Sequence, residues 1–151
     1  MYLLGILLYV ICLVSLSALG GNLSYFLNLP SLVIILALTL PMLLASGLLS
    51  DFLKGFSLMV KKVNLYSAID LKRILEADKL AIQSLAIAGF VGTITGMIAI
   101  LANLSEPAKL GPSLSVAFIT VLYSLIFISL ILPVRAKVSS ILVTLEQEQV
   151  K

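Results

Sequence analysis

The side chains of this sequence that could do chemistry are mostly small hydroxyls, set inside long runs without any charge. One helical face would carry the small residues Ser113, Ala117, Thr120 and Ser124, which follow one another at spacings of four, three and four. A second set consists of Gly89, Gly92, Thr93 and Gly96, in which 92–96 forms a GxxxG element that lets helix backbones approach closely. These faces could line a polar seam or pore, or they could be packing surfaces whose hydroxyls bond back to the carbonyl four residues earlier.

The sequence lacks the residue sets of common enzymes and metal sites. It has no histidine, and its single cysteine, Cys12, lies inside an apolar run. A disulfide within one chain and the usual zinc sites are therefore excluded. No GxSxG turn or phosphate-binding loop is present. We predict a protein that is not an enzyme and that has no metal site, no cofactor and no nucleic-acid partner.

Long apolar runs indicate an all-α integral membrane protein. Hydrophobic residues make up 61% of the 151 residues and charged residues only 11%, so lipid is the better solvent for this chain. Uncharged runs at about 3–19, 31–49, 80–105 and 110–134 approach or exceed the ~20 residues that a helix needs to cross a bilayer. We predict one domain, 1–151, with four transmembrane helices at about 2–19, 31–53, 67–104 and 112–146. The last two would extend beyond the bilayer.

The basic residues lie almost entirely on one side of these predicted helices. Of the ten Lys and Arg residues, only Lys109 falls in a loop on the opposite side. This bias predicts that both termini and the segment 54–80 are cytoplasmic. Ser67 and Asp70 resemble a capping box and predict that the third helix starts there. The charged side chains expected to contact another protein are Lys61, Lys62, Asp70, Lys72, Arg73, Glu76 and Asp78.

Two stretches of the chain resemble a known family. Residues 20–37, GGNLSYFLNLPSLVIILA, look like the segment between the family's first two helices. Residues 89–138 begin with GFVGTITG, continue through the loop NLSEPAKLGP and end with LILPVRAKV. They are similar to the family's GxxGTxxG helix, its Gly-Pro loop and its closing proline before a basic residue. On these motifs the chain resembles the MotA branch of the MotA/TolQ/ExbB family of ion-driven stators and energisers.

The resemblance implies a multi-pass subunit of an ion-driven motor in a bacterial inner (cytoplasmic) membrane. Members form a homo-pentamer around two single helices of a MotB- or ExbD-like partner, whose Asp binds and releases H⁺ or Na⁺. That partner would supply the ionisable group that the uncharged runs lack, and a rotor could be the load, as in flagellar motility. The residues implied near the ion pathway are Thr93, Thr120 and Tyr123. Those implied in helix packing are Gly89, Gly92 and Gly96, and those implied in coupling are Ala86 and Pro133.

The chain departs from the family pattern at three places. Ala86 stands where the family often has proline, and Val121 stands where its fourth helix usually has threonine. The segment between the second and third helices is also much shorter than in flagellar members. These departures motivate an alternative: a non-conducting structural or interaction protein of the membrane that retains the family fold.

Overall fold

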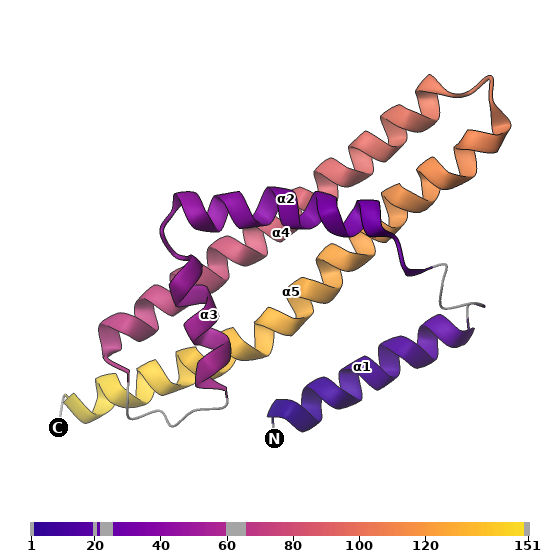
Figure 1. Ribbon diagram of the computed structural model, residues 1–151. Coiled ribbons are helices and arrows are strands. Elements are labelled where there is room, and N and C mark those ends of the chain that lie inside the picture. Colours follow the sequence, from indigo (N-terminus) through magenta and orange to yellow (C-terminus); the bar gives the residue numbers. More distant parts are fainter. Residues whose placement is uncertain (1, 20, 22–25, 60–65, 150–151) are drawn as a thin grey trace.

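The computed structural model describes residues 2–19, 21, 26–59 and 66–149, and these residues form five helices (Figure 1). The helices are α1 (Tyr2–Leu19), α2 (Leu29–Ala45), α3 (Leu49–Leu58), α4 (Ala68–Ala102) and α5 (Pro107–Gln149). No strand occurs within the described ranges. The prediction of an all-α chain is confirmed.

Helices α4 and α5 form a long antiparallel hairpin, against which α2 and α3 pack (Figure 1). They have 35 and 43 residues, or roughly 52 and 64 Å at ~1.5 Å per residue, so both exceed the thickness of a bilayer core. Helix α4 begins where the sequence predicts. Ser67 Oγ accepts a hydrogen bond from the backbone N–H of Ile69, and Asp70 Oδ2 accepts one from the N–H of Ser67 at 3.1 Å.

Helix α5 begins at Pro107, five residues before the predicted start at 112. Gly111 and Pro112 suggest a loop in the sequence, but the helix starts earlier, at Pro107, the first helical position, where a proline needs no intrahelical N–H partner. Pro112 therefore lies inside α5. The turn between the two helices is therefore only 103–106. Asn103 ends α4, and its side-chain amide donates to the carbonyl of Ala99 at 2.7 Å.

The predicted helix 31–53 is wrong as a single element, because it divides into α2 and α3 with a bend of 104°. Gly47 has a φ of +68°, the left-handed conformation that favours glycine at a helix end. Its N–H donates to the carbonyl of Leu44 at 3.0 Å, and the N–H of Leu48 donates to that of Leu43 at 3.2 Å. This pair of bonds is a Schellman motif, which ends α2 and redirects the chain.

Helix α2 starts two residues before the predicted position, at Leu29. Asn28 caps it, since its side-chain oxygen accepts a hydrogen bond from the N–H of Ser31 at 3.1 Å. Pro30 lies in the first turn, where its missing N–H costs nothing. The helix then lies across the hairpin, as Figure 1 shows.

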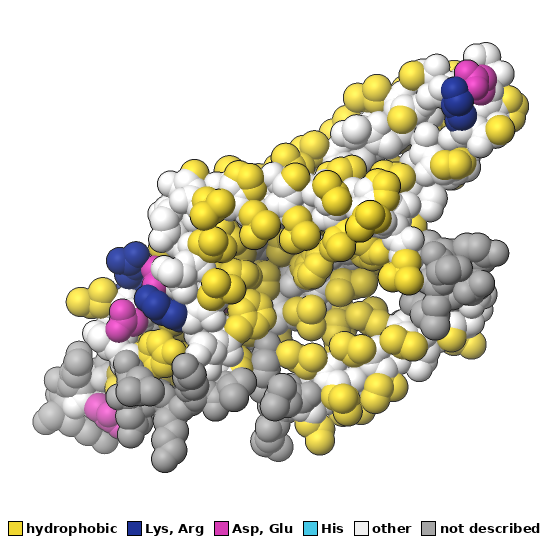
Figure 2. Space-filling view, viewed as in Figure 1, with side chains coloured by type: hydrophobic (Ala, Val, Ile, Leu, Met, Phe, Trp, Pro, Cys, Tyr) yellow, Lys and Arg dark blue, Asp and Glu magenta, His cyan; other side chains and the backbone are white. Residues whose placement is uncertain are grey.

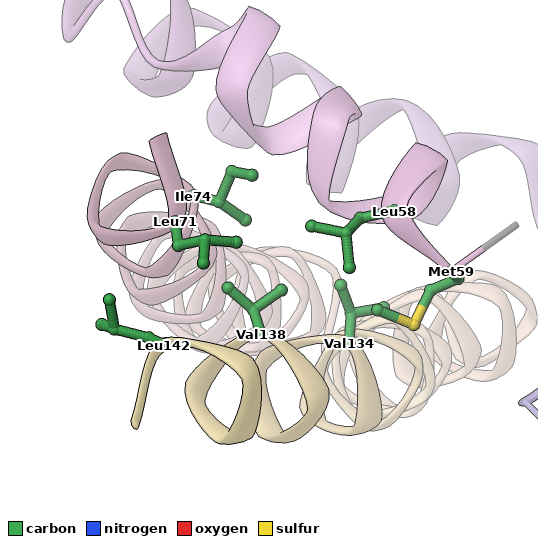
Figure 3. Close-up of a cluster of buried hydrophobic side chains, with 7 residues drawn as sticks. All are labelled: Leu58, Met59, Leu71, Ile74, Val134, Val138 and Leu142. Carbon is green, nitrogen blue, oxygen red and sulfur yellow. The ribbon is translucent and has the colours of Figure 1, made fainter. Parts of the chain in front are cut away.

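Two apolar clusters hold the helices together. The first joins α3, the residue after it, α4 and α5 (Figure 3), through Leu58, Met59, Leu71, Ile74, Val134, Val138 and Leu142. The second joins α2 to the hairpin through Ile35, Leu43, Ala81, Leu85, Ala88 and Ile131. Helix α1 lies to one side, where the hydroxyls of Tyr9 and Ser129 share a hydrogen bond.

The described helices include two that are long and apolar enough to cross a membrane, α4 and α5. Helices α2 and α3 together make a third candidate span if the bent pair is counted as one. The four predicted spans are thus supported in part, since α2 alone has 17 residues and the apolar part of α1, Leu4–Ser15, is shorter still. Figure 2 shows hydrophobic side chains over the middle of the molecule and charged ones near its two ends.

Candidate functional site in the hairpin of α4 and α5

Three glycines of α4 face three small residues of α5 along one seam. A Cβ atom on Gly92 would lie 2.3 Å from Cγ2 of Thr120, far inside van der Waals contact. A Cβ on Gly96 would lie 2.6 Å from Cβ of Ala117, and one on Gly89 would lie 2.7 Å from Cβ of Ser124. Only glycine lets the two backbones approach this closely. We name this set of three contacts the glycine seam.

The hydroxyls near the glycine seam are occupied by backbone carbonyls. Thr120 Oγ1 donates to the carbonyl of Val116 at 2.6 Å, and Thr93 Oγ1 donates to that of Gly89 at 2.9 Å. Both are bonds to the residue four positions earlier, as expected for a packing surface. Ser124 is different, because its Oγ crosses to α4 and donates to the carbonyl of Leu85 at 2.7 Å.

The three residues implied near the ion pathway do not meet in one chain. Thr120 is fully buried in the glycine seam. Tyr123 is tied to the segment before α2, where its hydroxyl donates to the carbonyl of Phe26 at 2.6 Å and accepts from the N–H of Asn28 at 3.0 Å. Thr93 keeps a partly exposed side chain on α4. Of the three, Thr93 is therefore the residue that a second protein could reach most directly.

The two positions at which the chain departs from the family lie together. Ala86 and Val121 line one shallow hollow of about 170 Å³ on the hairpin. We name it the Ala86 hollow, and its remaining lining residues are Gly89, Phe90, Ser124, Leu125 and Ile128. All of these residues belong to α4 and α5, so α1, α2 and α3 do not cover it. The sequence does not reveal this hollow, because it depends on how α4 and α5 cross.

Pro133, the other residue implied in coupling, lies on the side of α5 that faces α1. With Gly5, Ile6, Tyr9 and Ser129 it lines a gap of about 290 Å³ between these helices. Ala86 and Pro133 therefore belong to different surfaces of the hairpin in one chain.

The charged residues predicted as a contact surface are in part engaged within the chain. Lys61 and Lys62 lie outside the described residues. Lys72 pairs with Glu146 of α5 at 2.9 Å, and Glu76 lies 3.8 Å from Lys79. Asp70 belongs to the cap of α4. Asp78 is fully buried, so its prediction as a surface contact is wrong for the single chain.

Asp51 is a structural ion-pair residue that the sequence did not single out. Its side chain is 3% exposed, and its two oxygens accept hydrogen bonds from Lys54 at 2.7 Å and from Arg73 at 2.9 Å. The pairing ties α3 to α4 and uses Arg73, one of the predicted contact residues. The only available signal was that Asp51 is the first charged residue of the chain.

Asp78 is the other buried carboxylate, and it has no such partners. Neither of its oxygens has a hydrogen-bond partner in the described part of the chain. It lies in the segment 54–80, which the sequence places outside the membrane. Burial raises the pKa of this carboxyl from its usual 3.8 to about 7, against the opposing charge of Arg135 on α5. No cluster of His, Cys, Asp and Glu among the described residues could hold a metal ion.

Comparison with known proteins gives a match on this hairpin. The model of the MotA/TolQ/ExbB proton channel family matches residues 68–149, which include all of α4 and α5. The chain is 36% identical over 52 residues to "Chemotaxis protein PomA" of Vibrio alginolyticus, covering 34% of this chain and 21% of that protein. It is 50% identical over 38 residues to "Motility protein A" of Aquifex aeolicus, covering 25% of this chain and 15% of that protein.

These alignments span about a fifth or less of the length of either relative. No solved structure matches the chain. The family match is broader, because residues 68–149 are just over half of the 151 residues, and it identifies a channel family rather than an enzyme family. The chain is a member of the MotA/TolQ/ExbB proton channel family.

Proposed function

We propose that this chain is a MotA-like, ring-forming subunit of an ion-driven membrane motor. Together with a MotB- or ExbD-like partner that contributes an Asp, it converts the flow of H⁺ or Na⁺ into rotation or mechanical work. The observation that carries the proposal is that the family match falls on the hairpin, whose uncharged runs at 80–105 and 110–134 hold no Asp, Glu, Lys, Arg or His. A channel of this kind needs a carboxylate from another chain.

The proposed arrangement in the membrane follows from the charge pattern. The uncharged parts of α4 and α5 cross the bilayer, and α1 and α2 cross beside them as the third and fourth spans. Helix α3 and the charged first turns of α4 lie in the cytoplasm with both termini. The partner helix packs on the Ala86 hollow, because this surface is apolar and is left uncovered by the chain's own helices. Five copies form the ring.

Thr93 is the residue of the hairpin best placed to assist the ion. Its hydroxyl hydrogen is used by the carbonyl of Gly89, which leaves the oxygen lone pairs free to approach a cation. On α4 it follows Ala86 and Phe90 at helical spacing, so it continues the side of the helix that carries the hollow. It is one turn from Phe90, which is 70% exposed.

Replacing Thr93 with valine is expected to reduce partner-dependent ion flux about tenfold or more without preventing assembly. A hydrogen bond to a charged group is worth roughly 1.5–3 kcal/mol, whereas valine keeps the shape of threonine. Ion flux into vesicles that contain the chain and its partner measures the effect. Thr95→Val is the matched control, since Thr95 makes the same bond to its own i−4 carbonyl at 2.8 Å and lies on another side of α4.

Two results would count against this proposal. Equal flux in Thr93→Val and Thr95→Val would remove Thr93 from the pathway. Purification of a stable monomer or a two-fold dimer, in place of a five-fold ring, would argue against a motor subunit altogether.

A non-conducting membrane protein is the second candidate. The Ala86 hollow favours it, since both single-residue departures from the family pattern line it: alanine in place of proline, and valine in place of threonine. The discriminating observation is the gene beside this one. A protein with one N-terminal transmembrane helix that contains an Asp supports the motor, and its absence supports the second candidate.

A further inference from the structure

Asp78 is a buried acid without a counter-ion in contact. Its side chain is fully buried between α3, α4 and α5, and both carboxylate oxygens lack a hydrogen-bond partner among the residues that the structure describes. An ionised carboxylate in that position would lose its hydration and gain only the attraction of the charge on Arg135, which forms no hydrogen bond with it, and burying such a charge costs several kcal/mol or more. The geometry therefore favours the neutral, protonated acid.

Helix α3 covers this acid at a glycine. A Cβ atom on Gly55 would lie 3.5 Å from Oδ1 of Asp78, 3.1 Å from Cγ2 of Ile74 and 3.4 Å from Cγ1 of Val134. The backbone of α3 thus lies directly on α4 and α5 at this point. Leu58, one turn later, is fully buried in the cluster of Figure 3. With α3 in this position, Asp78 has no solvent-accessible surface.

The three helices around Asp78 carry charged groups, and within the described ranges none of these forms an ion pair with it. On α5, Arg135 is half-buried and acts on Asp78 through its charge alone. On α3, Asp51 and Lys54 pair with each other, and Asp51 also binds Arg73 of α4. On α4, Lys79 faces Glu76. The proton is therefore the ligand that makes burial of Asp78 favourable.

We infer that Asp78 is a proton-binding site of this chain itself. We also infer that α3 covers this site and that its packing against α4 and α5 requires the bound proton. Release is a simple dissociation, in which the O–H bond of the acid breaks and the proton passes to water at the exposed side of α3. The remaining carboxylate then gains water as α3 lifts. The bend at Gly47, where φ is +68°, is the hinge, since it separates α3 from α2.

The direction of the pH dependence follows from the raised pKa of Asp78. In the covered state α3 packs over Asp78, and in the open state α3 has moved away and water reaches the carboxyl. The covered state binds the proton more tightly than the open state, in which the carboxyl has its usual pKa of 3.8. The contribution of Asp78 to the stability of the covered state is therefore complete below pH 3.8, falls as the pH rises toward about 7, and is constant above that. Hydrogen bonds from Lys54 and Arg73 lower the pKa of Asp51, so its contribution is lost only below pH 3.8.

The cover can be followed by the distance between spin labels at Leu53 of α3 and Ile69 of α4, which are 60% and 71% exposed. Cys12 is replaced by serine, and labelled chains are diluted among unlabelled ones in lipid nanodiscs. From about pH 4 to about pH 8, a range that spans both pKa values of Asp78, we expect one short distance to become longer and broader. The midpoint should lie between pH 3.8 and about 7, because the stability of the covered state falls over that interval.

Asp78→Asn tests whether ionisation of Asp78 controls the position of α3, because asparagine has the shape of the neutral acid and cannot ionise. It should keep the short distance at every pH. Glu76→Gln removes a 67% exposed acid of the same helix and should respond as the unaltered chain does. The inference fails if Asp78→Asn retains the full pH response, or if the unaltered chain shows none.

Infrared difference spectra between the same two pH values give a second measurement, which reports the protonation of the Asp78 carboxyl directly. The unaltered chain should lose the carbonyl band of a protonated carboxylic acid on going to high pH, and Asp78→Asn should lack that band. If the band is absent from the unaltered chain, Asp78 binds no proton and the inference is overturned. Neither measurement needs a partner or ion flow, so the outcome is independent of the proposed motor.

Discussion

Replacing Gly92 with alanine is expected to lower the free energy of unfolding by about 1–3 kcal/mol, the usual cost of overpacking a core. The added methyl would lie 2.3 Å from Cγ2 of Thr120, and the backbone of α4 would have to move away from α5. Unfolding in mixed micelles, with the detergent composition fixed, measures the change. Because the glycine seam runs along the hairpin, we expect partner-dependent ion flux to fall as well.

A second substitution tests whether Thr120 is the cause. Thr120→Ser removes Cγ2, after which the nearest atoms of that residue to the new methyl are Cβ at 3.1 Å and Oγ at 3.3 Å. Gly92→Ala should therefore cost less in a Thr120→Ser chain, with a coupling of about 1 kcal/mol. Gly5→Ala is the control, since its Cβ would meet nothing within 4 Å. Additive effects of the two seam substitutions would contradict the close contact.

Replacing Ala86 with tryptophan is expected to abolish most partner-dependent ion flux while leaving the chain folded. Ala86 is exposed in the single chain, so a large side chain there fills the Ala86 hollow rather than the chain's own core. Blocking a central contact of an interface typically costs about 2 kcal/mol or more, which is roughly 30-fold in affinity. Co-purification of the partner, ion flux and thermal stability are the measurements.

The mass of the purified assembly shows whether the Ala86 hollow contacts the partner helix or a neighbouring copy of this chain. An intact ring that has lost its partner places the Ala86 hollow at the partner helix, as proposed. A ring that falls apart would place the hollow between copies of this chain and contradict the proposal. Ala45→Trp, at an exposed alanine that ends α2, is the matched control and should leave both the ring and the flux unchanged.

Features of the fold that depend on neighbouring residues could be predicted from the sequence. The cap of α4 needs only Ser67 and Asp70, and both bonds form as expected. The break between α2 and α3 had a local signal as well, in the pair Ser46 and Gly47, but the apolar run across it suggested one continuous helix. A glycine can lie inside a membrane helix or end one, and only the bonds made by its neighbours decide between these.

Features that depend on distant contacts could not be predicted. Asp78 reads as a solvent-exposed charge because Glu76 and Lys79 flank it, yet the packing of α3 over α4 buries it. Tyr123 reads as a residue of the hairpin alone, whereas its hydroxyl joins Phe26 and Asn28, almost a hundred positions away along the chain. The spacing of Gly92 and Thr120 allowed either a pore or a packing seam, and their separation across the two helices shows contact within one chain.

We propose that the hairpin moves ions only with a carboxylate supplied by another chain. The direct measurement is proton or sodium flux into sealed vesicles that contain this chain alone, this chain with its single-helix partner, or this chain with a partner whose membrane Asp is replaced by asparagine. We predict flux in the second preparation only. Flux of equal size from this chain by itself, or with the asparagine partner, would show that the hairpin needs no carboxylate from a partner.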